Sequence, residues 1–563
     1  MNHSVSKSKS KRIAERALKT TSTSLVILGG TLINSNGEAP IEDAMIVIKR
    51  NRIQSVTHRG DISFPKNSKI IDVKGKTILP GFMDGHGHYE DFAGEIYLHL
   101  GVTTCPDIEI FRDDYWSLAQ RDGIRCGKIR GPRLWTAGRG LGPRHPSWSM
   151  PGGRAFRGTL PFSTPDEARA LIREKKRIGH DIIKLNELLT PELLKTAVDE
   201  AHNLGMPVVA HSLDIWSYAP AGINGVEHHW SVALSSIADT EKRQKLALDR
   251  MFGRVDTEEI PYYSEPENFD RLIDVMVKNG VSWTPTIATW LRPVSPSAKQ
   301  FLVRERSILD NPKAKYLPPV VRAYSFGQYE KFAKWTPEKL SRVKQGYEKL
   351  EDFMRRFVRA GGIIRAGSDP SNGMPAMGVH QELKMFVEAG LTPARAISTA
   401  TINVAKTYFK DKEFGSIEAE KIADIIVVDG DPLNDIWTTQ KVKTVILGGK
   451  IMDTKFHASY KNPIPSPDPW KFVPREIAIS PPSILQATAT RKIKVNAQRL
   501  QPYHRVALNG TELETRYVSR TELEAKIPAK IIKEPGVYDV TVVSPGEFSA
   551  RSSPTHLIVT FRH

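Results

Sequence analysis

The sequence predicts an α/β protein built around a (β/α)8 TIM-type barrel, with a small composite β-sandwich formed by the two flanks of the barrel and a further β-sandwich at the C-terminus. Three observations favour this fold. Short strand-like runs alternate with longer helical stretches in the middle of the chain, β-rich segments lie on either side of that middle, and residues 478–563 contain only short β-type runs. Alternating strands and helices are typical of a parallel sheet covered by helices. The 563 residues allow several units, because a barrel takes about 250–400 residues.

The flanks of the barrel carry matching β-rich segments. Residues 24–76 hold short apolar runs separated by Asn-Gly and Gly turns, and residues 411–458 repeat this pattern far downstream. Such runs are typical of small antiparallel strands. We therefore expect one β-sandwich that is split in sequence, with the barrel, residues 77–410, inserted between its two parts.

Eight strand-like segments are expected to form the barrel. They are residues 77–88, 101–108, 132–139, 181–186, 207–212, 225–230, 282–286 and 363–370. Three long inserts, residues 138–165, 235–275 and 290–350, are expected to cover the face at the carboxyl ends of the strands, where barrels carry their specificity.

The remaining segments are expected to be a tail, a linker and a C-terminal domain. Residues 1–23 predict a basic flexible tail. The five prolines in residues 461–477 predict a semi-rigid linker, with bounds 459–477, and residues 478–563 follow it as the C-terminal domain.

Composition excludes several classes of protein. The formal charge is +17, but the basic residues are spread along the chain without a nucleic-acid-binding motif, so no nucleic-acid partner is expected. Cys105 and Cys126 predict neither a disulfide framework nor a paired metal spacing. No run of 18 apolar residues and no apolar leader are visible, which predicts no membrane span and a cytoplasmic location if the sequence is complete.

Residues that can bind a metal stand at the ends of the expected strands. His86 and His88 are two residues apart, so strand periodicity aims both side chains to one side. This pair alone is weak evidence of a metal site. However, further residues of this kind end other strands, and barrel strands converge on one face, which predicts one shared pocket. The whole set is His86, His88, Lys184, His211, His228 and Asp369.

These motifs resemble the amidohydrolase superfamily. The strings are "PGFMDGHGH", "DIIKLN", "VVAHS", "GVEHH" and "AGSDP", with "GLTPARAISTATINVAKTY" and "VKTVILGGK" downstream. The match covers about residues 24–455 and is closest to the binuclear branch that includes metal-dependent Xaa-Pro dipeptidase-like and imidazolonepropionase-related proteins.

The resemblance implies two divalent metal ions, expected to be zinc. By the family pattern the first ion is held by His86, His88 and Asp369, and the second by His211 and His228. Lys184 would bridge both ions as a carbamate formed with carbon dioxide, which would explain a lysine inside the apolar run "DIIKLN". His229 competes with His228 because adjacent strand residues face opposite sides. His228 is preferred because it directly follows the glutamate of "VEH".

The expected reaction is hydrolysis of an amide-type carbon–nitrogen bond in a small peptide or an N-acyl amino acid. By the resemblance, a hydroxide shared by the two metals attacks, and Asp369 acts as general base and then acid. Alternatives are a lactone or phosphoester hydrolase, a mononuclear deaminase on the same fold, and a non-catalytic binding protein. His380 and Glu382 in "GVHQELKMF" are interpreted as structural residues of a helix.

Substrate and partner contacts are expected in two further places. Relatives often carry a Gly-Gly-His-Gly element where this chain reads "PGGRAF", so Arg154, with Arg144 or His145, is a candidate to bind a substrate carboxylate. The C-terminal domain is similar to the immunoglobulin-like IPT/TIG fold, from "ISPPSI" and "GVYDVTVVSP". That similarity implies a contact with an envelope, a carbohydrate or a protein, and it favours a periplasmic or extracellular location instead.

Overall fold

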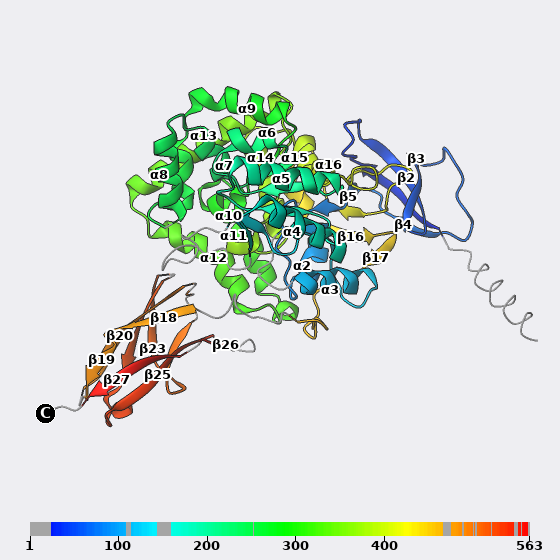
Figure 1. Cartoon of the computed structure of the whole chain (residues 1–563). Helices are drawn as coiled ribbons and strands as arrows, with labels where there is room; N and C mark the ends of the chain where they lie inside the picture. Colours follow the sequence, from blue (N-terminus) through cyan, green and yellow to red (C-terminus); the bar gives the residue numbers. More distant parts are fainter. Residues whose placement is uncertain are drawn as a thin grey trace, which may run out of the picture.

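The computed structural model describes a β-rich flank, a mixed α/β middle and a β-rich C-terminal region, which Figure 1 shows in sequence colours. The described residues are 24–108, 114–143, 159–251, 253–465, 475–486, 489–498, 500, 504–519, 521–544, 550–552 and 554–560. Within these ranges, no helix is both long enough and apolar enough to cross a membrane.

The two flanks pair in one eight-stranded sheet, whereas the composite β-sandwich stays a prediction. From the N-terminal side come β1 (Leu25–Leu32), β2 (Ile41–Lys49), β3 (Arg52–His58), β4 (Lys69–Asp72) and β5 (Thr77–Pro80), and from the far side β15 (Ile425–Val428), β16 (Val442–Leu447) and β17 (Lys450–Met452). The order is β17-β16-β15-β5-β1-β2-β3, with β4 beside β1. β5 joins the halves because it pairs with β1 in parallel and with β15 in antiparallel register. Residues 77–80 therefore lie in the flank sheet and not in a barrel strand.

The middle of the chain contains parallel strands in the expected order. They are β6 (Phe82–Met83), β7 (Val102–Asp107), β8 (Arg133–Thr136), β11 (Ile183–Leu185), β12 (Val208–Ala210), β13 (Gly225–Glu227) and β14 (Ser282–Thr284). Residue Ile364 forms a parallel bridge with Trp283. Each strand is shorter than its sequence prediction, because regular backbone pairing stops before the end of the apolar run. The interval 225–230 shows this most clearly, because His229 already begins α7 (His229–Ser235).

The parallel strands fall into two ladders among the described residues. One has the order β6-β7-β8, and the other has the order β10-β9-β11-β12-β13-β14. The Asp181 amide donates to the Thr136 carbonyl across 2.8 Å, and the Gly85 amide donates to the Ala366 carbonyl across 2.7 Å. These bonds link the ladders at β8 and β11, and link the first parallel segment to the last. The insert 138–165 contributes β9 (Leu141–Pro143) and β10 (Leu160–Phe162), which the sequence did not predict.

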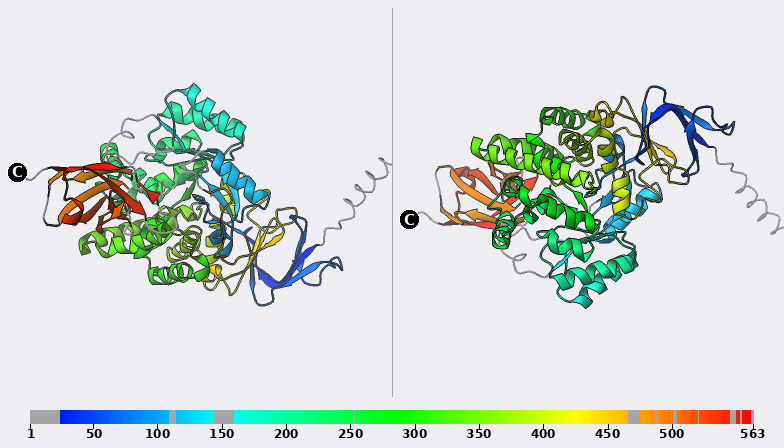
Figure 2. Two further views of the ribbon diagram at one scale, coloured as in Figure 1. Left: turned by 90° about the horizontal axis from the view of Figure 1, so that it is seen from below. Right: turned by 90° about the horizontal axis from the view of Figure 1, so that it is seen from above.

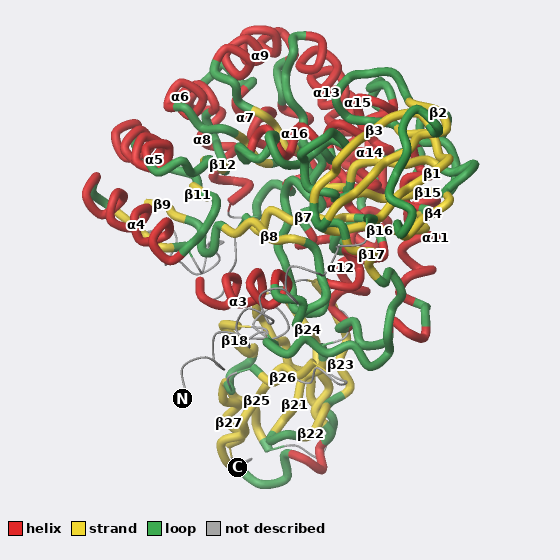
Figure 3. The backbone as a smooth tube through the Cα atoms, turned by 90° about the vertical axis from the view of Figure 1, so that its right-hand side faces the viewer, coloured by secondary structure: helices red, strands yellow, loops and turns green. Residues whose placement is uncertain are grey.

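Helices surround these strands, as Figures 2 and 3 show from other directions. They are α2 (Gly94–His99), α3 (Asp114–Arg125), α4 (Pro165–Ile178), α5 (Pro191–Asn203), α6 (Ile215–Ala221), α9 (Phe269–Lys278), α13 (Pro337–Arg359), α14 (Met377–Glu388), α15 (Pro393–Thr399) and α16 (Ile402–Thr407). Their ends follow local sequence. The Thr164 hydroxyl accepts the Glu167 amide at the start of α4, Pro165 takes the first position, and Gly179 ends the helix at φ 103°.

The other two long inserts are helical. They form α8 (Thr240–Met251), α10 (Ile287–Leu291), α11 (Ala298–Leu309) and α12 (Pro319–Ala333). Arg292 is fully buried and donates to the carbonyls of Ala288 in α10 and of Ser325 in α12, so it fastens two insert helices to each other.

The first part of the predicted linker is bonded to the middle of the chain. The Asn462 amide donates to the Gln120 side chain across 2.8 Å, and Gln120 donates in turn to the Ile464 carbonyl. The Trp116 indole donates to the Pro465 carbonyl across 3.2 Å. Residues 459–465 therefore lie along α3 instead of forming a free spacer, and residues 466–474 fall outside the described residues.

The C-terminal region consists of two sheets around one apolar core, and their strands pair in antiparallel register except for β19 and β27, which are parallel. The first sheet holds β18 (Arg475–Ser480), β20 (Arg491–Gln498), β24 (Glu522–Ile527) and β23 (Glu514–Ser519). The second holds β19 (Ser483–Leu485), β27 (Thr555–Thr560), β25 (Gly536–Ser544), β21 (Arg505–Leu508), β22 (Thr511–Glu512) and β26 (Ala550–Arg551). The β-rich prediction is confirmed, whereas the immunoglobulin-like assignment stays a prediction. Lys334 Nζ lies 5.9 Å from the ring centre of Tyr517, so this region contacts the end of α12.

Candidate metal centre

The six residues expected to bind metals come from five separate segments of the parallel sheet. His86 and His88 follow β6, Lys184 lies in β11, His211 follows β12, His228 follows β13, and Asp369 follows the segment that contains Ile364. All six lie where parallel strands end or are about to end, which is where this class of fold gathers its functional side chains.

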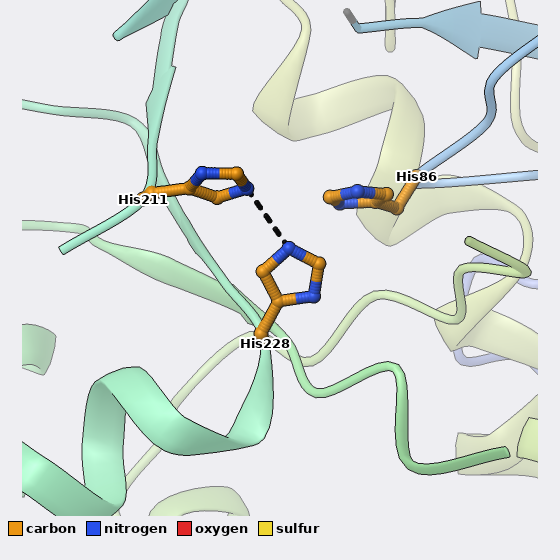
Figure 4. A group of neighbouring side chains, drawn as sticks. All are labelled: His86, His211 and His228. Carbon is orange, nitrogen blue, oxygen red and sulfur yellow. Dashed lines mark hydrogen bonds between the residues drawn. The ribbon is translucent and has the colours of Figure 1, made fainter. Parts of the chain in front are cut away.

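Four of these residues are histidines, and three of them gather around one point. His86, His211 and His228 are buried, and each offers a ring nitrogen within 4.8 Å of the others. Figure 4 shows their rings meeting from different segments, with His211 Nε2 and His228 Nε2 2.9 Å apart. His86 also belongs to a second group, with His88 and Asp369, that meets the same limit. Two overlapping groups thus share His86.

Asp369 connects the two groups. Its Oδ1 lies 3.6 Å from His88 Nε2, and its Oδ2 lies 3.6 Å from His228 Nδ1. Burial alone would raise the pKa of the Asp369 carboxyl, but His86, His88 and the Ser371 hydroxyl lower that pKa below its ordinary value. The carboxyl is therefore ionised at neutral pH.

Lys184 is buried beside the histidines. Lys184 is 1% exposed. Burial lowers the pKa of His228, and the charges of His86, His211 and Lys184 lower it further. Burial alone would raise the pKa of Glu227, but Arg365, His86 and, to a smaller extent, Lys184 lower it. A lysine in this position is a charged group in an apolar strand, where an ammonium is expensive to keep.

Three of the histidines present Nδ1 to an oxygen and leave Nε2 toward the centre of the site. His86 Nδ1 lies 2.6 Å from Glu227 Oε2, and His228 Nδ1 lies 2.8 Å from Thr286 Oγ1. His211 Nδ1 lies 3.6 Å from Glu187 Oε2. An oxygen on one ring nitrogen fixes the ring orientation and directs the other nitrogen to a metal, an arrangement common among metal-binding histidines.

Charged and aromatic side chains contact Glu187 and His228 in turn. Arg250 Nη2 lies 3.3 Å from Glu187 Oε1, and the Arg250 guanidinium lies 4.5 Å from the Trp230 ring centre. Trp230 stacks on His228 at 3.8 Å. Burial alone would raise the pKa of Glu187, but His211 and Arg250 lower that pKa to about 2, so the carboxylate facing His211 stays charged.

The backbone is strained at three residues of the site. His228, Thr286 and Asp369 have φ angles of 67°, 48° and 32°, in the left-handed region that residues other than glycine seldom adopt. Such strain is concentrated at functional sites, where the surrounding structure holds it. Here it turns His228 and Asp369 away from the strand direction and toward the other residues of the site.

The other residues singled out in the sequence lie away from this cluster or outside the described residues. His229 is buried and contacts the Thr257 carbonyl at 3.2 Å, so it faces away from the cluster that His228 joins. Arg144, His145 and Arg154 lie outside the described residues. His380 contacts the Leu100 carbonyl and Thr439, which confirms the structural interpretation of that residue.

Sequence analysis missed the residues that support the metal-binding side chains. Glu227 is the glutamate of "GVEHH", recognised there only as a marker for His228, and Glu187 directly follows "DIIKLN", so an ionisable residue in or beside a buried strand was a usable signal. Arg250 gave no such signal, because it comes from helix α8, whereas Arg365 lies in the expected strand 363–370 and its partner Glu227 comes from another strand.

The donor set fits a divalent metal. Zinc binds imidazole nitrogen at about 2.0–2.1 Å, which places two nitrogens of one tetrahedral site about 3.3 Å apart. The separation of 2.9 Å between His211 and His228 is close to that value, and the remaining donors lie within the reach of one or two ions.

Comparison with known proteins agrees with this geometry. Residues 188–452 match the model of the amidohydrolase family. This part of the chain, a little under half of its length, is therefore similar to amidohydrolases. The matched range contains His211, His228 and Asp369 of the site, whereas His86, His88 and Lys184 precede it. The match indicates that the chain is an enzyme.

Curated relatives of this chain are distant in sequence. An adenine deaminase of Clostridium botulinum (strain ATCC 19397 / Type A) is 22% identical over 501 residues, which cover 86% of this chain and 68% of that protein. Two adenine deaminases from other strains of that species are each covered over 57% of their length. The chain therefore spans between about half and two thirds of the length of these curated relatives.

Solved structures show the same fold. A Bifidobacterium longum protein assigned as a prolidase has a TM-score of 0.57 and 21% identity, with 79% of this chain and 97% of that chain covered. A Xaa-Pro dipeptidase with bound methionine in its active site has a TM-score of 0.53 and 21% identity, with 77% and 100% covered. At this identity the likeness concerns the fold alone.

Proposed function

We propose that this chain is a binuclear metal-dependent hydrolase that cleaves an amide-type carbon–nitrogen bond in a small peptide or an N-acyl amino acid. The observation that carries the proposal is the pair of overlapping groups around His86, one containing His88 and Asp369 and the other containing His211 and His228. The proposal takes the parallel strands as a closed (β/α)8 barrel, which the fold of the similar solved structures supports.

In the proposed centre, Lys184 would supply the ligand that the two ions share. In this proposal the neutral amine of Lys184 adds to carbon dioxide, a nitrogen–carbon bond forms as one carbon–oxygen π bond opens, and a proton leaves to solvent. The resulting carbamate has one negative charge and two oxygens, so it suits a pair of cations better than an ammonium does. The buried position of Lys184 beside His228 supports this role.

Asp369 is the proton carrier of the proposed reaction. When bound, two divalent ions would lower the pKa of water from 15.7 toward about 7 and polarise the substrate carbonyl. Asp369, ionised and buried between the two groups of the site, accepts the proton of the attacking water. It then delivers that proton to the nitrogen of the leaving amine, so the carbon–nitrogen bond breaks without releasing an amide anion.

A screen of dipeptides and N-acyl amino acids on protein loaded with zinc or manganese in the presence of bicarbonate tests this function. We expect release of a free amino acid from at least one of these substrate classes. Hydrolysis confined to lactones or phosphoesters would contradict the amide proposal while leaving the metal centre in place, because the same ions polarise those groups too.

Deamination is the second candidate, because the curated relatives are adenine deaminases. A deaminase releases ammonia from an aromatic amidine, whereas an amide hydrolase splits its substrate into an acid and an amine. Incubation of the loaded protein with adenine separates the candidates: ammonia released from adenine, with no cleavage in the dipeptide screen, would favour the deaminase.

Recognition of a substrate carboxylate is proposed for Arg154, with Arg144 or His145. The proposal is supported by the sequence "PGGRAF", in which arginine stands where relatives often have histidine. We expect Arg154→Ala to abolish the preference for substrates with a free carboxylate over matched amides. Equal selectivity in the two proteins would contradict this role.

A further inference from the structure

A buried chain of polar contacts lies beneath the proposed metal centre. Arg365 Nη2 lies 2.8 Å from Glu227 Oε1, and the other oxygen of the same carboxylate lies 2.6 Å from His86 Nδ1. The side chains of Arg365 and Glu227 are both 0% exposed, and that of His86 is 1% exposed. Three segments therefore meet through one carboxylate: the end of β13, the segment after Ile364, and the loop after β6.

The arginine is itself held by groups on either side. Its Nη1 donates to the Tyr408 hydroxyl across 2.9 Å and to the Gly85 carbonyl across 3.2 Å. Tyr408 donates to the same Gly85 carbonyl across 2.9 Å. Because Gly85 directly precedes His86, Arg365 fixes both the side chain and the backbone of the segment that carries His86.

The strand beside the arginine leaves space for it. A Cβ atom added at Gly225 would lie 2.4 Å from Arg365 Nη2, which is closer than real Cβ contacts allow. Gly225 begins β13, two residues before Glu227. A side chain at position 225 would displace the Arg365 guanidinium, so the glycine leaves room for the contact between Arg365 and Glu227.

From this geometry we infer that Arg365 is a positioning residue for the metal centre. It holds the Glu227 carboxylate in the orientation that fixes the His86 ring, so that His86 Nε2 faces the metal. The inference rests on the proposed function, since His86 is the residue that both groups of the site share. Substitution of a group that orients a metal-binding histidine typically weakens metal binding or activity about 10- to 100-fold.

The alternative is an ion pair that stabilises the fold only. Breaking a fully buried pair on one side destabilises a protein, whereas removing both charges is often neutral. A structural role therefore predicts that loss of metal affinity follows loss of stability and is recovered with it. A positioning role predicts that affinity stays low after stability has been recovered.

Four variants of the full chain separate these roles. They are Arg365→Met, Glu227→Gln, the double variant that combines them, and Glu305→Gln as the matched control. Glu305 is 0% exposed and lies 3.5 Å from the fully buried Arg292 in the insert, so its change neutralises an equally buried carboxylate that has no contact with His86. Zinc affinity is measured by competition with a chelator, and unfolding of the metal-free protein is measured in parallel.

We expect Arg365→Met and Glu227→Gln to weaken zinc binding by about 10-fold or more. The double variant is expected to regain the stability of the metal-free protein without regaining zinc affinity, and Glu305→Gln to bind zinc within about twofold of the wild type. Arg365→Met with unchanged zinc affinity, or a double variant in which affinity returns with stability, would overturn the inference. A wild type that binds no zinc would instead contradict the proposed function.

Discussion

Ring orientation decides what each histidine of this chain can do. His86 and His228 use Nδ1 on Glu227 and Thr286 and keep Nε2 for the cluster, whereas both ring nitrogens of His380 meet Leu100 and Thr439. A histidine whose two nitrogens are both engaged by the protein has none left for a metal. Residue type and position in a motif therefore identify candidates, and the partner of each nitrogen separates metal-binding residues from structural ones.

Asp369→Asn tests the proton carrier directly. The change preserves shape and one oxygen but removes the charge that accepts a proton, so we expect turnover to fall about 100-fold or more. Metal content is measured on the same samples, because Asp369 is also a proposed metal-binding residue. Full turnover with normal metal content would show that another group carries the proton.

The proximity of the candidate residues could be predicted from sequence, whereas their roles in metal binding stay a prediction. His86, His88, Lys184, His211, His228 and Asp369 lie in or just after expected strands, and the structure brings all of them to one region. Arg365 and Glu227 are 138 positions apart, and no local pattern encodes their contact. Their pairing depends on which strands become neighbours, which only the folded chain reveals.

Strand boundaries show the same limit among the elements. Apolar runs correctly predicted the order of the parallel strands, but Gly225–Glu227 ends three residues before its prediction because His229 starts a helix. β9 and β10 were missed since three residues are too few for a periodic signal. Propensity locates an element, whereas tertiary contacts decide where it begins and ends.

Helix α14 makes stability depend on pH through His380. Burial lowers the pKa of His380 to about 4, against about 6.5 in an unfolded chain. Between these values the unfolded chain binds a proton that the folded protein does not, so the free energy of unfolding falls as pH falls. The slope for one such histidine is about 1.4 kcal/mol per pH unit.

Denaturant unfolding of wild type and His380→Gln between pH 7 and pH 4 checks this contribution. We expect the variant to lose stability less steeply with falling pH, at equal metal concentration. Parallel curves for the two proteins would show that His380 is not protonated differently in the folded and unfolded states.

The segment after β17 depends on a buried carboxylate in α2. The Glu95 side chain is 0% exposed, accepts the His457 amide across 2.9 Å, and lies 2.8 Å from Arg130 Nη1. Glu95→Gln leaves these partners with a neutral acceptor, so we expect a loss of about 1–3 kcal/mol in unfolding free energy.

Asp453→Asn is the control for that change. Asp453 lies 3.8 Å from Arg130 and is half exposed, so its neutralisation should alter stability by less than about 0.5 kcal/mol. Equal losses in the two variants would show that burial of Glu95 is not what holds this segment.

In the whole molecule, the C-terminal region has a core of its own. Its buried apolar residues, such as Val495, Leu523 and Val542, pack together from both sheets. The metal-binding residues are packed in the middle of the chain instead. We therefore expect a chain that ends at residue 465 to keep the metal content of the full protein, measured after purification. Loss of metal on truncation would show that the C-terminal sheets support the centre.

The binuclear centre is the central claim, and metal content of Lys184→Ala tests it most directly. Metals per chain are counted by elemental analysis after loading with zinc and bicarbonate, for the wild type and the variant. We expect two ions in the wild type, fewer in Lys184→Ala, and partial recovery of activity when small carboxylic acids are added. Two tightly bound ions in Lys184→Ala, or no stoichiometric metal in the wild type, would contradict the account.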